Sequence, residues 1–320
     1  MSLVRPAPRA DLSGRSVLSL RHHSSESIAA ILELAADLKT AARPWPNWLA
    51  GRVVALIFEK PSTRTRVSFE TAIARLGGTA VTMNAGDLQL GRGETVEDTA
   101  IVLSRFVDAI VIRAASHERV EELARCASVP VVNALTPAHH PCQGLADAQT
   151  LIQRFGDVAG LPIAYLGDGN NCFNSLAVMA AHLGLNLTCG SPAGYLPSDE
   201  LVSWANTEAT ARGGSVRVTS DPRDAVANVR AIYTDVWVSM GDEAQETERL
   251  RAFAGFEVNQ SMMDLAGPGA IALHPLPAHY GLEIAQSVAH GPQSALWDEA
   301  ENRLHAQAAL LTYLLPELEQ

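Results

Sequence analysis

The run Val53-Val54-Ala55-Leu56-Ile57-Phe58, followed by Glu59-Lys60-Pro61-Ser62-Thr63-Arg64-Thr65-Arg66, decides the fold that we expect for this chain. The first part is a short, continuous apolar run, which predicts a buried strand. The second part opens with proline and with cap-type hydroxyl residues, which predicts the start of a helix. The apolar residues expected on the buried side of that helix are Val67, Phe69, Ile73 and Leu76.

The expected turn gathers several groups that bind phosphate. The first backbone N–H groups of a helix lack partners within the helix and lie at the positive end of its dipole. Ser62, Thr63 and Thr65 add hydroxyl groups. Arg64 and Arg66 add two guanidinium forks, so the turn is suited to an anion. An ordinary capped helix with exposed arginines explains the same residues equally well, but it does not explain the polar residues that follow later strands.

Strand and helix patterns alternate along the whole chain, which predicts parallel sheets covered by helices on both faces. Around the central strand we expect helices at 24–39, 95–107 and 118–126, and strands at 79–83, 109–113 and 129–135. A second series of strands is expected at 163–166, 187–189, 216–218, 231–234 and 270–273, before a final helix at 299–315. The fold class is therefore α/β, with two doubly wound parallel-sheet domains.

We expect the first domain over residues 1–148, with residues 303–320 packing back on it, and the second domain over 149–302. A length of 320 residues suits two domains of ordinary size. Doubly wound domains bind ligands at the carboxyl ends of their strands. We therefore expect the active site in the cleft between the two domains.

Composition excludes several classes of function. With 24 Lys and Arg against 35 Asp and Glu, the chain lacks the basic surface that nucleic acids require. It contains no apolar run of membrane-spanning length and no pattern of a signal peptide, so we expect a cytoplasmic protein with no membrane partner. The four cysteines form no C-x-x-C pair, which argues against structural zinc and disulfides.

Polar motifs follow strand after strand, and this clustering is the main sign of an active site. Parallel strands bring their carboxyl ends to the same edge of a sheet, so these residues are expected to converge. Taken singly, each residue has an ordinary structural explanation, such as a surface arginine or a helix cap. The motifs are Arg113, His140-Pro141-Cys142-Gln143, Asp168-Gly169-Asn170-Asn171, Asp235 to Gly241, and His274-Pro275-Leu276-Pro277.

These motifs resemble those of the aspartate and ornithine carbamoyltransferase family over nearly the whole chain. Residues 62–66, Arg113, and His140-Pro141-x-Gln143 with Asp147 resemble its carbamoyl-phosphate signature. The second half is similar to the ornithine branch, at Gly167 to Asn171, Asp235 to Gly241, and Glu301-Asn302-Arg303. The resemblance implies attack of the side-chain amine of ornithine on carbamoyl phosphate, giving citrulline and phosphate, a step of arginine biosynthesis. It calls for no enzyme nucleophile, no metal and no organic cofactor.

The resemblance also implies a role for each matching residue. Arg113, His140, Thr65 and Asp235 would be catalytic. The implied ornithine-binding residues are Asn171, Asp235, Ser239 and Met240. The implied carbamoyl-phosphate-binding residues are Ser62, Thr63, Arg64, Thr65, Gln89, Arg113, His140, Gln143, Pro275, Leu276 and Arg303. In this family the loop that holds Gln89 reaches the neighbouring subunit's site, which implies a homotrimer or a multiple of trimers.

One position departs from the family's pattern. Enzymes of the ornithine branch usually have cysteine where this chain has Pro275, between His274 and Leu276. Proline at this place is closer to the aspartate branch. However, Asp235 would repel the additional carboxylate of aspartate, which favours ornithine as the acceptor.

Other functions remain possible from the sequence. The nearest is a carbamoyltransferase for another amine, such as putrescine, an N-acylornithine or aspartate. A dinucleotide-dependent oxidoreductase would share the doubly wound domains, but the sequence contains no full G-x-G-x-x-G. A homologue that binds without catalysis is the third, and the intact phosphate-binding residues argue against it.

Overall fold

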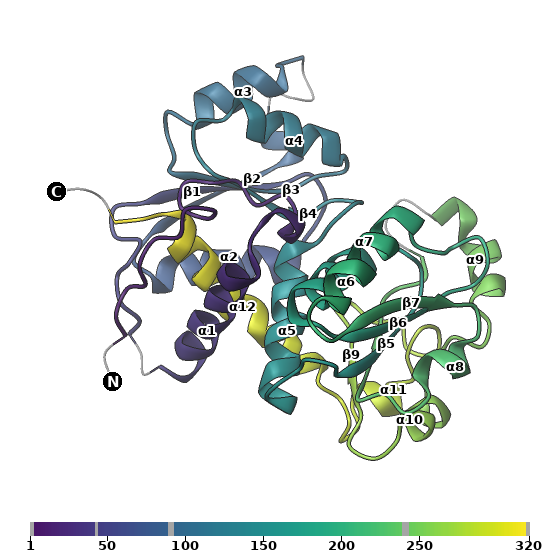
Figure 1. Ribbon diagram of the computed structural model, residues 1–320. Helices are drawn as coiled ribbons and strands as arrows, with labels where there is room; N and C mark the ends of the chain where they lie inside the picture. Colours follow the sequence, from purple (N-terminus) through teal and green to yellow (C-terminus); the bar gives the residue numbers. More distant parts are fainter. Residues whose placement is uncertain (1–2, 42–43, 89–92, 239–242, 318–320) are drawn as a thin grey trace. The chain divides into compact units, whose positions relative to one another are not determined.

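The computed structural model describes residues 3–41, 44–88, 93–238 and 243–317. Contacts within the chain divide it into two compact units. Unit 1 comprises residues 1–149 and 301–320, and unit 2 comprises residues 150–300. Each unit is an α/β unit built on one parallel sheet, which confirms the predicted fold class (Figure 1). The cleft between two domains remains a prediction.

Unit 1 is built on a four-stranded sheet in the order β2-β1-β3-β4. Its strands are β1 (Val53–Phe58), β2 (Thr79–Asn84), β3 (Ala109–Arg113) and β4 (Val131–Leu135), and its first helices are α1 (Ser25–Thr40), α2 (Thr63–Arg75), α3 (Val96–Leu103) and α4 (His117–Cys126). Figure 1 shows α3 and α4 on one face of the sheet and α1 and α2 on the other. Strand order reverses between β1 and β3, so the segments after these two strands lie side by side at the point where doubly wound sheets bind ligands.

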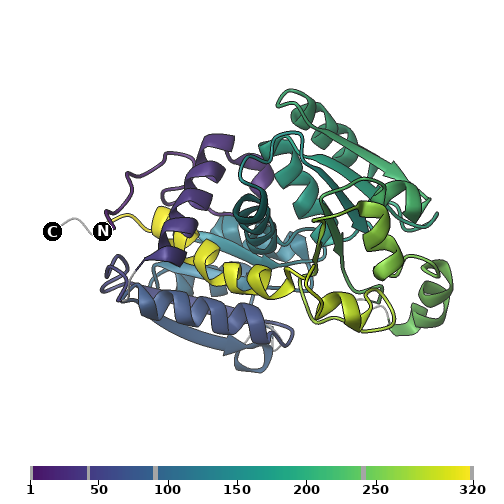
Figure 2. The same cartoon turned by 90° about the horizontal axis from the view of Figure 1, so that it is seen from below.

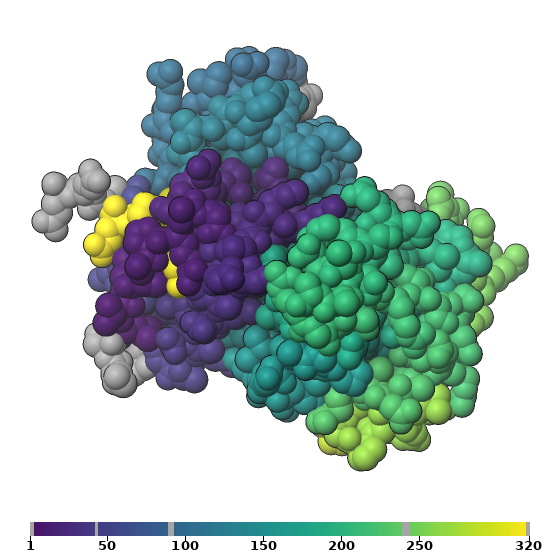
Figure 3. Space-filling model, in the orientation of Figure 1, coloured from purple at the N-terminus to yellow at the C-terminus, as the bar shows by residue number. Residues whose placement is uncertain are grey.

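The two ends of the chain meet in unit 1. Helix α5 (Pro141–Phe155) leads from unit 1 into unit 2, and α12 (Leu296–Leu314) leads back. Figures 1 and 2 show α12 beside α1, and the Lys39 ammonium of α1 donates to Oδ1 of Asn302 at 2.7 Å. In the view of Figure 3 only a small part of the yellow C-terminal residues is visible. Residues 305–314 of α12 are all buried, so the helix that carries Arg303 lies in the interior of unit 1.

Unit 2 is built on a five-stranded sheet in the order β7-β6-β5-β8-β9. Its strands are β5 (Pro162–Leu166), β6 (Asn186–Gly190), β7 (Ser215–Thr219), β8 (Ala231–Thr234) and β9 (Ile271–Leu273), and its helices are α6 (Asn171–Leu183), α7 (Asp199–Thr210), α8 (Pro222–Val226), α9 (Glu246–Ala252), α10 (Gln260–Ala266) and α11 (Gln286–Ala289). Helices α6 and α7 cover one face, and α8 and α10 the other (Figure 1). The strand order reverses between β5 and β8. No helix in the described part of the chain is both long and apolar enough to cross a membrane.

Two local predictions are wrong. Val67 does not lie on the buried side of α2, because its side chain is 53% exposed while Phe69 and Ile73 are fully buried. Successive residues of a helix turn by about 100°, so a residue two positions before Phe69 faces the opposite side. The helix predicted at 95–107 ends at Leu103, where the Ser104 hydroxyl donates to the carbonyl oxygen of Ala100. Side-chain bonds of this kind compete with the helix.

Candidate functional site

The helix start after β1 has the geometry of an anion site. Ser62 is the N-cap residue of α2, but its side chain makes no capping hydrogen bond. Its hydroxyl instead accepts a hydrogen bond from Nη1 of Arg113 at 3.3 Å. The first turn of α2 carries no acidic residue. The first N–H groups of the helix are therefore not capped by Ser62, which is the condition under which a helix start binds an anion.

Arg113 is placed at this helix start by the register of the sheet. It is the last residue of β3 and pairs with Phe58 at the end of β1. The backbone N–H of Glu59 donates to the carbonyl oxygen of Arg113 at 3.0 Å, which fixes the turn that leads to α2. The guanidinium therefore projects at the reversal of strand order in unit 1.

Arg303 joins three segments of unit 1 that lie far apart in the sequence. Its side chain is 3% exposed. Nη2 donates to Oγ1 of Thr65 at 2.9 Å, and Nη1 donates to Oε1 of Gln143 at 2.7 Å. Nε2 of Gln143 donates in turn to Oδ1 of Asp147 at 2.8 Å. Because the Thr65 hydroxyl oxygen accepts from Arg303, its own hydrogen can be donated to a ligand.

His140 lies among the cationic residues of this cluster. Its side chain is 4% exposed, directly before α5. Burial, and then the charges of Arg303, Arg113 and Arg64, hold the pKa of His140 well below its usual range. Burial and the charge of Arg303 also lower the pKa of Arg64. Arg64 nevertheless stays positively charged, because arginine is not deprotonated in proteins. The charges of three guanidinium groups thus act on a neutral imidazole, which favours an anionic ligand.

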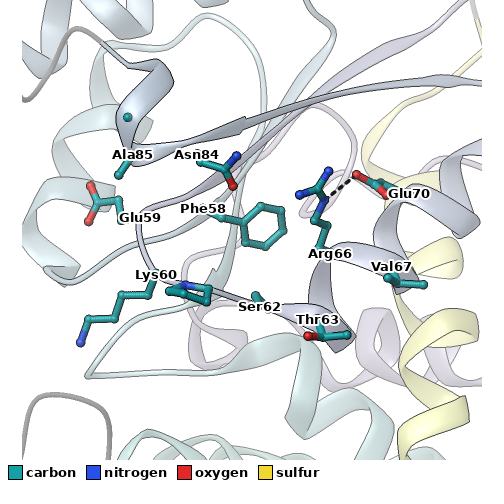
Figure 4. Close-up of a pocket in the computed structure, with 12 residues that line it drawn as sticks. Phe58, Glu59, Lys60, Ser62, Thr63, Arg66, Val67, Glu70, Asn84 and Ala85 are labelled. Atoms are coloured by element: carbon teal, nitrogen blue, oxygen red, sulfur yellow. Dashed lines mark hydrogen bonds and ion pairs between the residues drawn. The ribbon is translucent and has the colours of Figure 1, made fainter.

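A hollow of about 760 Å³ lies within unit 1 beside the start of α2. Thr63 and Arg66 line it together with Lys60, Glu70 and Asn84 (Figure 4). Nε of Arg66 is ion-paired with Oε1 of Glu70 at 2.9 Å. The expectation that Arg66 shares one small volume with Arg64 is therefore wrong, because side chains two positions apart on a helix point to opposite sides and Arg66 has a carboxylate partner.

Buried and half-buried histidines of unit 1 make its stability depend on pH. Burial lowers the pKa of His23, and burial followed by the charge of His117 lowers that of His139 to about 4. Burial lowers the pKa of His305 to about 4 as well. In the unfolded chain these rings take up protons below about pH 6.5, while the folded rings do not. Their stabilising contribution is thus complete above pH 6.5 and is lost as pH falls toward 4.

We expect His305→Gln to reduce this acid sensitivity. Each histidine whose pKa is lowered on folding reduces the free energy of unfolding by up to about 1.4 kcal/mol for each pH unit between its unfolded and folded pKa values. The measurement is the midpoint of urea unfolding at pH 8, 7, 6 and 5. The stability of wild type should fall more between pH 6.5 and 5 than that of the variant. Between pH 7 and 8 the stabilities of the two proteins should change by the same amount. Equal acid losses in both proteins would contradict the assignment.

In unit 2, the segments after β5 and β8 are joined where the strand order reverses. Asp235 follows β8 and is 7% exposed. Its Oδ1 accepts from the N–H of Val236, and its Oδ2 accepts from Nδ2 of Asn170, both at 2.8 Å. Asn170 also caps α6, whose first residue is Asn171. Sequence reasoning did not assign Asn170 a role, although an asparagine directly before a helix is a capping signal.

Arg249 is a second residue that sequence reasoning missed. It is 8% exposed, lies on α9, and forms an ion pair of 2.5 Å with Oδ2 of Asp168. It also donates to the carbonyl oxygen of Trp237 at 2.9 Å and lies over the Tyr195 ring. Arg249 therefore holds the segment after Asp235 against the segment after β5. No local pattern in the sequence marks it.

The remaining predicted residues fall in two groups. Pro275 and Leu276 follow β9, and Leu276 has a φ of 59°, a conformation that is uncommon for a residue with a side chain. Gln89, Ser239 and Met240 lie outside the described residues. The described site residues therefore form two clusters, one in each unit.

Comparisons with known proteins match both halves of the chain to one family. Residues 15–153 match the family model "Aspartate/ornithine carbamoyltransferase, carbamoyl-P binding domain", and residues 159–314 match "Aspartate/ornithine carbamoyltransferase, Asp/Orn binding domain". The ornithine carbamoyltransferase of Acidothermus cellulolyticus is 55% identical over 291 residues, which cover 90% of this chain and 92% of that protein. That of Pyrococcus abyssi is 48% identical over 307 residues, 95% of this chain and 96% of the relative.

Solved structures give the same result. The structure titled ornithine carbamoyltransferase from Pyrococcus furiosus superposes with a TM-score of 0.92 at 47% identity, covering 95% of this chain and 98% of that one. The ornithine carbamoyltransferase structure from Thermus thermophilus has a TM-score of 0.86 at 43% identity, covering 94% of this chain and 98% of that one. This chain belongs to the aspartate/ornithine carbamoyltransferase family.

Proposed function

We propose that this protein is an ornithine carbamoyltransferase, which transfers the carbamoyl group of carbamoyl phosphate to the side-chain amine of L-ornithine. The observation that carries the proposal is the arrangement of Arg64, Arg113 and Arg303 around His140, beside a helix start whose N-cap hydroxyl is not used for capping. The match of the chain's two halves to the two family domains supports it. In this proposal unit 1 carries the phosphate-binding residues, and the cluster around Asp235 in unit 2 binds ornithine.

The reaction needs orientation and charge stabilisation rather than an enzyme nucleophile. The neutral amine attacks the carbonyl carbon of carbamoyl phosphate, the C–O bond to phosphate breaks, and the proton that the amine loses passes to the departing phosphate. Arg113, His140 and the Thr65 hydroxyl donate hydrogen bonds to the oxygen that becomes negative. Ser62, Thr63, Arg64 and the start of α2 bind the departing phosphate. Because the imidazole of His140 is neutral, it is a hydrogen-bond donor that does not add a fourth full charge.

Recognition of ornithine is assigned to the cluster after β5 and β8. The carboxylate of Asp235 attracts the α-ammonium group of the substrate and disfavours a second carboxylate, as aspartate would bring. Asn171, Ser239 and Met240 complete the proposed set. The family resemblance further assigns Gln89, Gln143, Arg303, Pro275 and Leu276 to the binding of carbamoyl phosphate. We propose that the reaction serves arginine biosynthesis in the cytoplasm, where the four free thiols would stay reduced.

We also propose that the protein is a homotrimer or a multiple of trimers, in which Gln89 of one subunit serves the site of the next. Strand β2 is at the edge of the unit 1 sheet, and edges of this kind are usually covered. Exposed apolar side chains gather in the stretch 67–106, as expected of a contact surface; they are Val67, Val81, Ile101, Val102 and Phe106. Sedimentation at about three times the mass of one chain is expected, and a monomer would contradict the trimer.

The experiment that tests the reaction measures both products. Purified protein is incubated with carbamoyl phosphate and L-ornithine, and citrulline and phosphate are quantified over time. We expect the two to appear in equal amounts, and no phosphate above the spontaneous rate when ornithine is omitted. Release of phosphate without citrulline would show that the amine is not the acceptor, and the proposed function would fall.

A further inference from the structure

The N-terminal segment extends the sheet of unit 1 beyond β4. The backbone N–H of Val17 donates to the carbonyl oxygen of Val131 at 2.8 Å, and the N–H of Asn133 donates to that of Val17 at 2.9 Å. Val17 and Val132 thus form a parallel bridge. Because the segment runs parallel to β4, the residues that follow it come to the same edge of the sheet as those that follow β3 and β4.

Side chains from these three places line a hollow of about 820 Å³ within unit 1. They come from the N-terminal segment, from the start of α4, and from the residue before His140. Six of them can carry a positive charge: Arg15, Arg21, His22, His23, His117 and His139. The chain as a whole has 35 acidic side chains against 24 of Lys and Arg, so this concentration of basic groups runs against its composition.

The two acidic residues of the hollow are Asp11 and Glu121. Oδ2 of Asp11 accepts from the backbone N–H and the hydroxyl of Ser24 at 2.9 and 3.0 Å, and Oδ1 accepts from the hydroxyl of Ser27 at 2.6 Å. Asp11 therefore serves the start of α1. The side chain of Glu121 is 59% exposed, and its Oε1 lies 3.8 Å from Nε2 of His117. The hollow thus keeps more hydrogen-bond donors than acceptors.

The ring of His139 reports the positive charge of the hollow. Burial lowers its pKa to about 4, and the charges of His117, Arg21 and His22 add to the effect. Nδ1 of this ring is also buried without a hydrogen-bond partner among the described residues. A buried polar atom without a partner is costly, and so is a group of like charges. A bound anion would relieve the second cost directly.

The hollow suits an anion rather than a metal ion. Within the described ranges, no three or more His, Cys, Asp or Glu side chains are placed so that they could hold a metal ion. Guanidinium and imidazolium groups instead donate hydrogen bonds to phosphate and carboxylate oxygens. Here the donors come from three separate segments, which fits the oxygens of a tetrahedral phosphate group better than the two oxygens of a planar carboxylate.

The hollow differs from the carbamoyl-phosphate cluster in its residues but adjoins it along the chain. Its lining residues are not those whose charges act on His140. The backbone N–H of His139 donates to Oγ1 of Thr136 at 3.3 Å, and the same oxygen lies 2.8 Å from Nδ1 of His117. The segment that leads to His140 is therefore bonded to a residue of the hollow.

We propose that this hollow is a second anion site, separate from the carbamoyl-phosphate site, and that it binds a small molecule that carries a phosphate group. Arg15, Arg21 and His22 would bind the phosphate oxygens from one side, and His117 and His139 from the other. The hollow has room for an organic group beside the phosphate, so an organic phosphate and free phosphate are both sources of this chemistry. The inference does not require the proposed reaction.

Calorimetric titration with inorganic phosphate tests the site by counting anion sites. We expect wild type to bind two phosphate ions per chain and Arg64→Ala to bind one, because the substitution leaves only the hollow. Adding Arg21→Gln to Arg64→Ala should weaken the remaining site roughly tenfold or more, the effect of one lost charge-assisted hydrogen bond. Adding Arg217→Gln instead is the matched control, since this guanidinium is ion-paired with Asp224 on the surface of unit 2, and should leave the affinity unchanged.

The hollow would be ruled out if wild type bound one phosphate and Arg64→Ala none, or if Arg21→Gln left the remaining site as tight as before. If Arg64→Ala still binds two phosphate ions, the anion site at the start of α2 is wrong instead. His22→Gln tests the same hollow should Arg21→Gln fail to fold, because this ring is exposed. It should also weaken the site, and an unchanged affinity would contradict the proposal.

A second titration identifies the source of the phosphate group. Arg64→Ala is titrated with glycerol 3-phosphate, which has the same charged group and a small organic part. Affinity equal to or above that of inorganic phosphate would support an organic phosphate as the ligand, and weaker binding would support the free ion. Succinate is the control for anions in general, and binding of succinate as tight as that of both phosphates would overturn the choice of a phosphate group.

Discussion

Arg113→Ala and Arg64→Ala are each expected to lower turnover roughly 10²–10³-fold, since a charge-assisted contact to the developing negative charge stabilises the transition state by about 2–4 kcal/mol. The guanidinium of Arg113 reaches Ser62 at the helix start, and both arginines depress the pKa of His140. Removing either one leaves the other two cations of the cluster in place. The fold should therefore remain, because the loss concerns charge rather than packing.

The measurement is the steady-state rate of citrulline formation at saturating substrates, with circular dichroism to confirm the fold. Arg217→Ala is the matched control: its guanidinium forms an ion pair with Asp224 at 2.8 Å and is half exposed. Surface pairs of this kind contribute about 0–1 kcal/mol to stability, so the control should retain nearly full activity. Activity close to wild type in Arg64→Ala or Arg113→Ala would contradict the anion site in unit 1.

Asp235→Asn should abolish most of the use of ornithine while leaving the binding of carbamoyl phosphate unchanged. Asparagine keeps the shape of the side chain and an oxygen that can accept from Val236, but it removes the negative charge that attracts the α-ammonium group. Its other oxygen is replaced by an amide NH2 group, a donor that faces the donor Nδ2 of Asn170. Together these changes should lower kcat/KM for ornithine roughly 10²–10³-fold.

This prediction is checked by kcat/KM for ornithine and, separately, by calorimetric titration with carbamoyl phosphate. Asp224→Asn makes the same chemical change in the surface pair with Arg217 and should alter neither quantity. A loss of carbamoyl-phosphate binding as large as the loss for ornithine would show that Asp235 supports the whole site rather than the amine. Unchanged use of ornithine would remove Asp235 from the proposed ornithine set.

The strands and the helix starts could be predicted because their signals are local. The apolar run Val53–Phe58 and the proline and hydroxyl residues after it specify β1 and the start of α2 without reference to the rest of the chain. The same reasoning placed Arg113 and Asp235 at strand ends, where both lie in the structure. Errors arose where two faces of a helix had to be distinguished, as for Val67, which the 100° rotation per residue places in solvent.

Contacts between distant segments could not be predicted from local patterns. The pair of Arg303 with Thr65 joins residues 238 positions apart, and only the family resemblance suggested that they share a site. Arg249 lies on a short helix with an ordinary mixture of charged residues, and its burial follows from packing against Tyr195 and Trp237. Glu283 and Glu299 are both bonded to His274, and no composition rule indicates their complete burial.

The central claim, that free ornithine is the acceptor, is tested most directly by comparing kcat/KM for ornithine, putrescine, N-acetylornithine and aspartate with carbamoyl phosphate as the donor. Putrescine lacks the α-carboxylate and N-acetylornithine lacks the α-ammonium charge, so each of these two differs from ornithine in one recognised feature. Aspartate lacks the side-chain amine and adds a carboxylate, so it tests for the other branch of the family. We predict that ornithine is preferred over each of the other three by a wide margin. A preference for aspartate, or for either of the two ornithine analogues, would contradict the assignment of the cluster around Asp235 and with it the proposed acceptor.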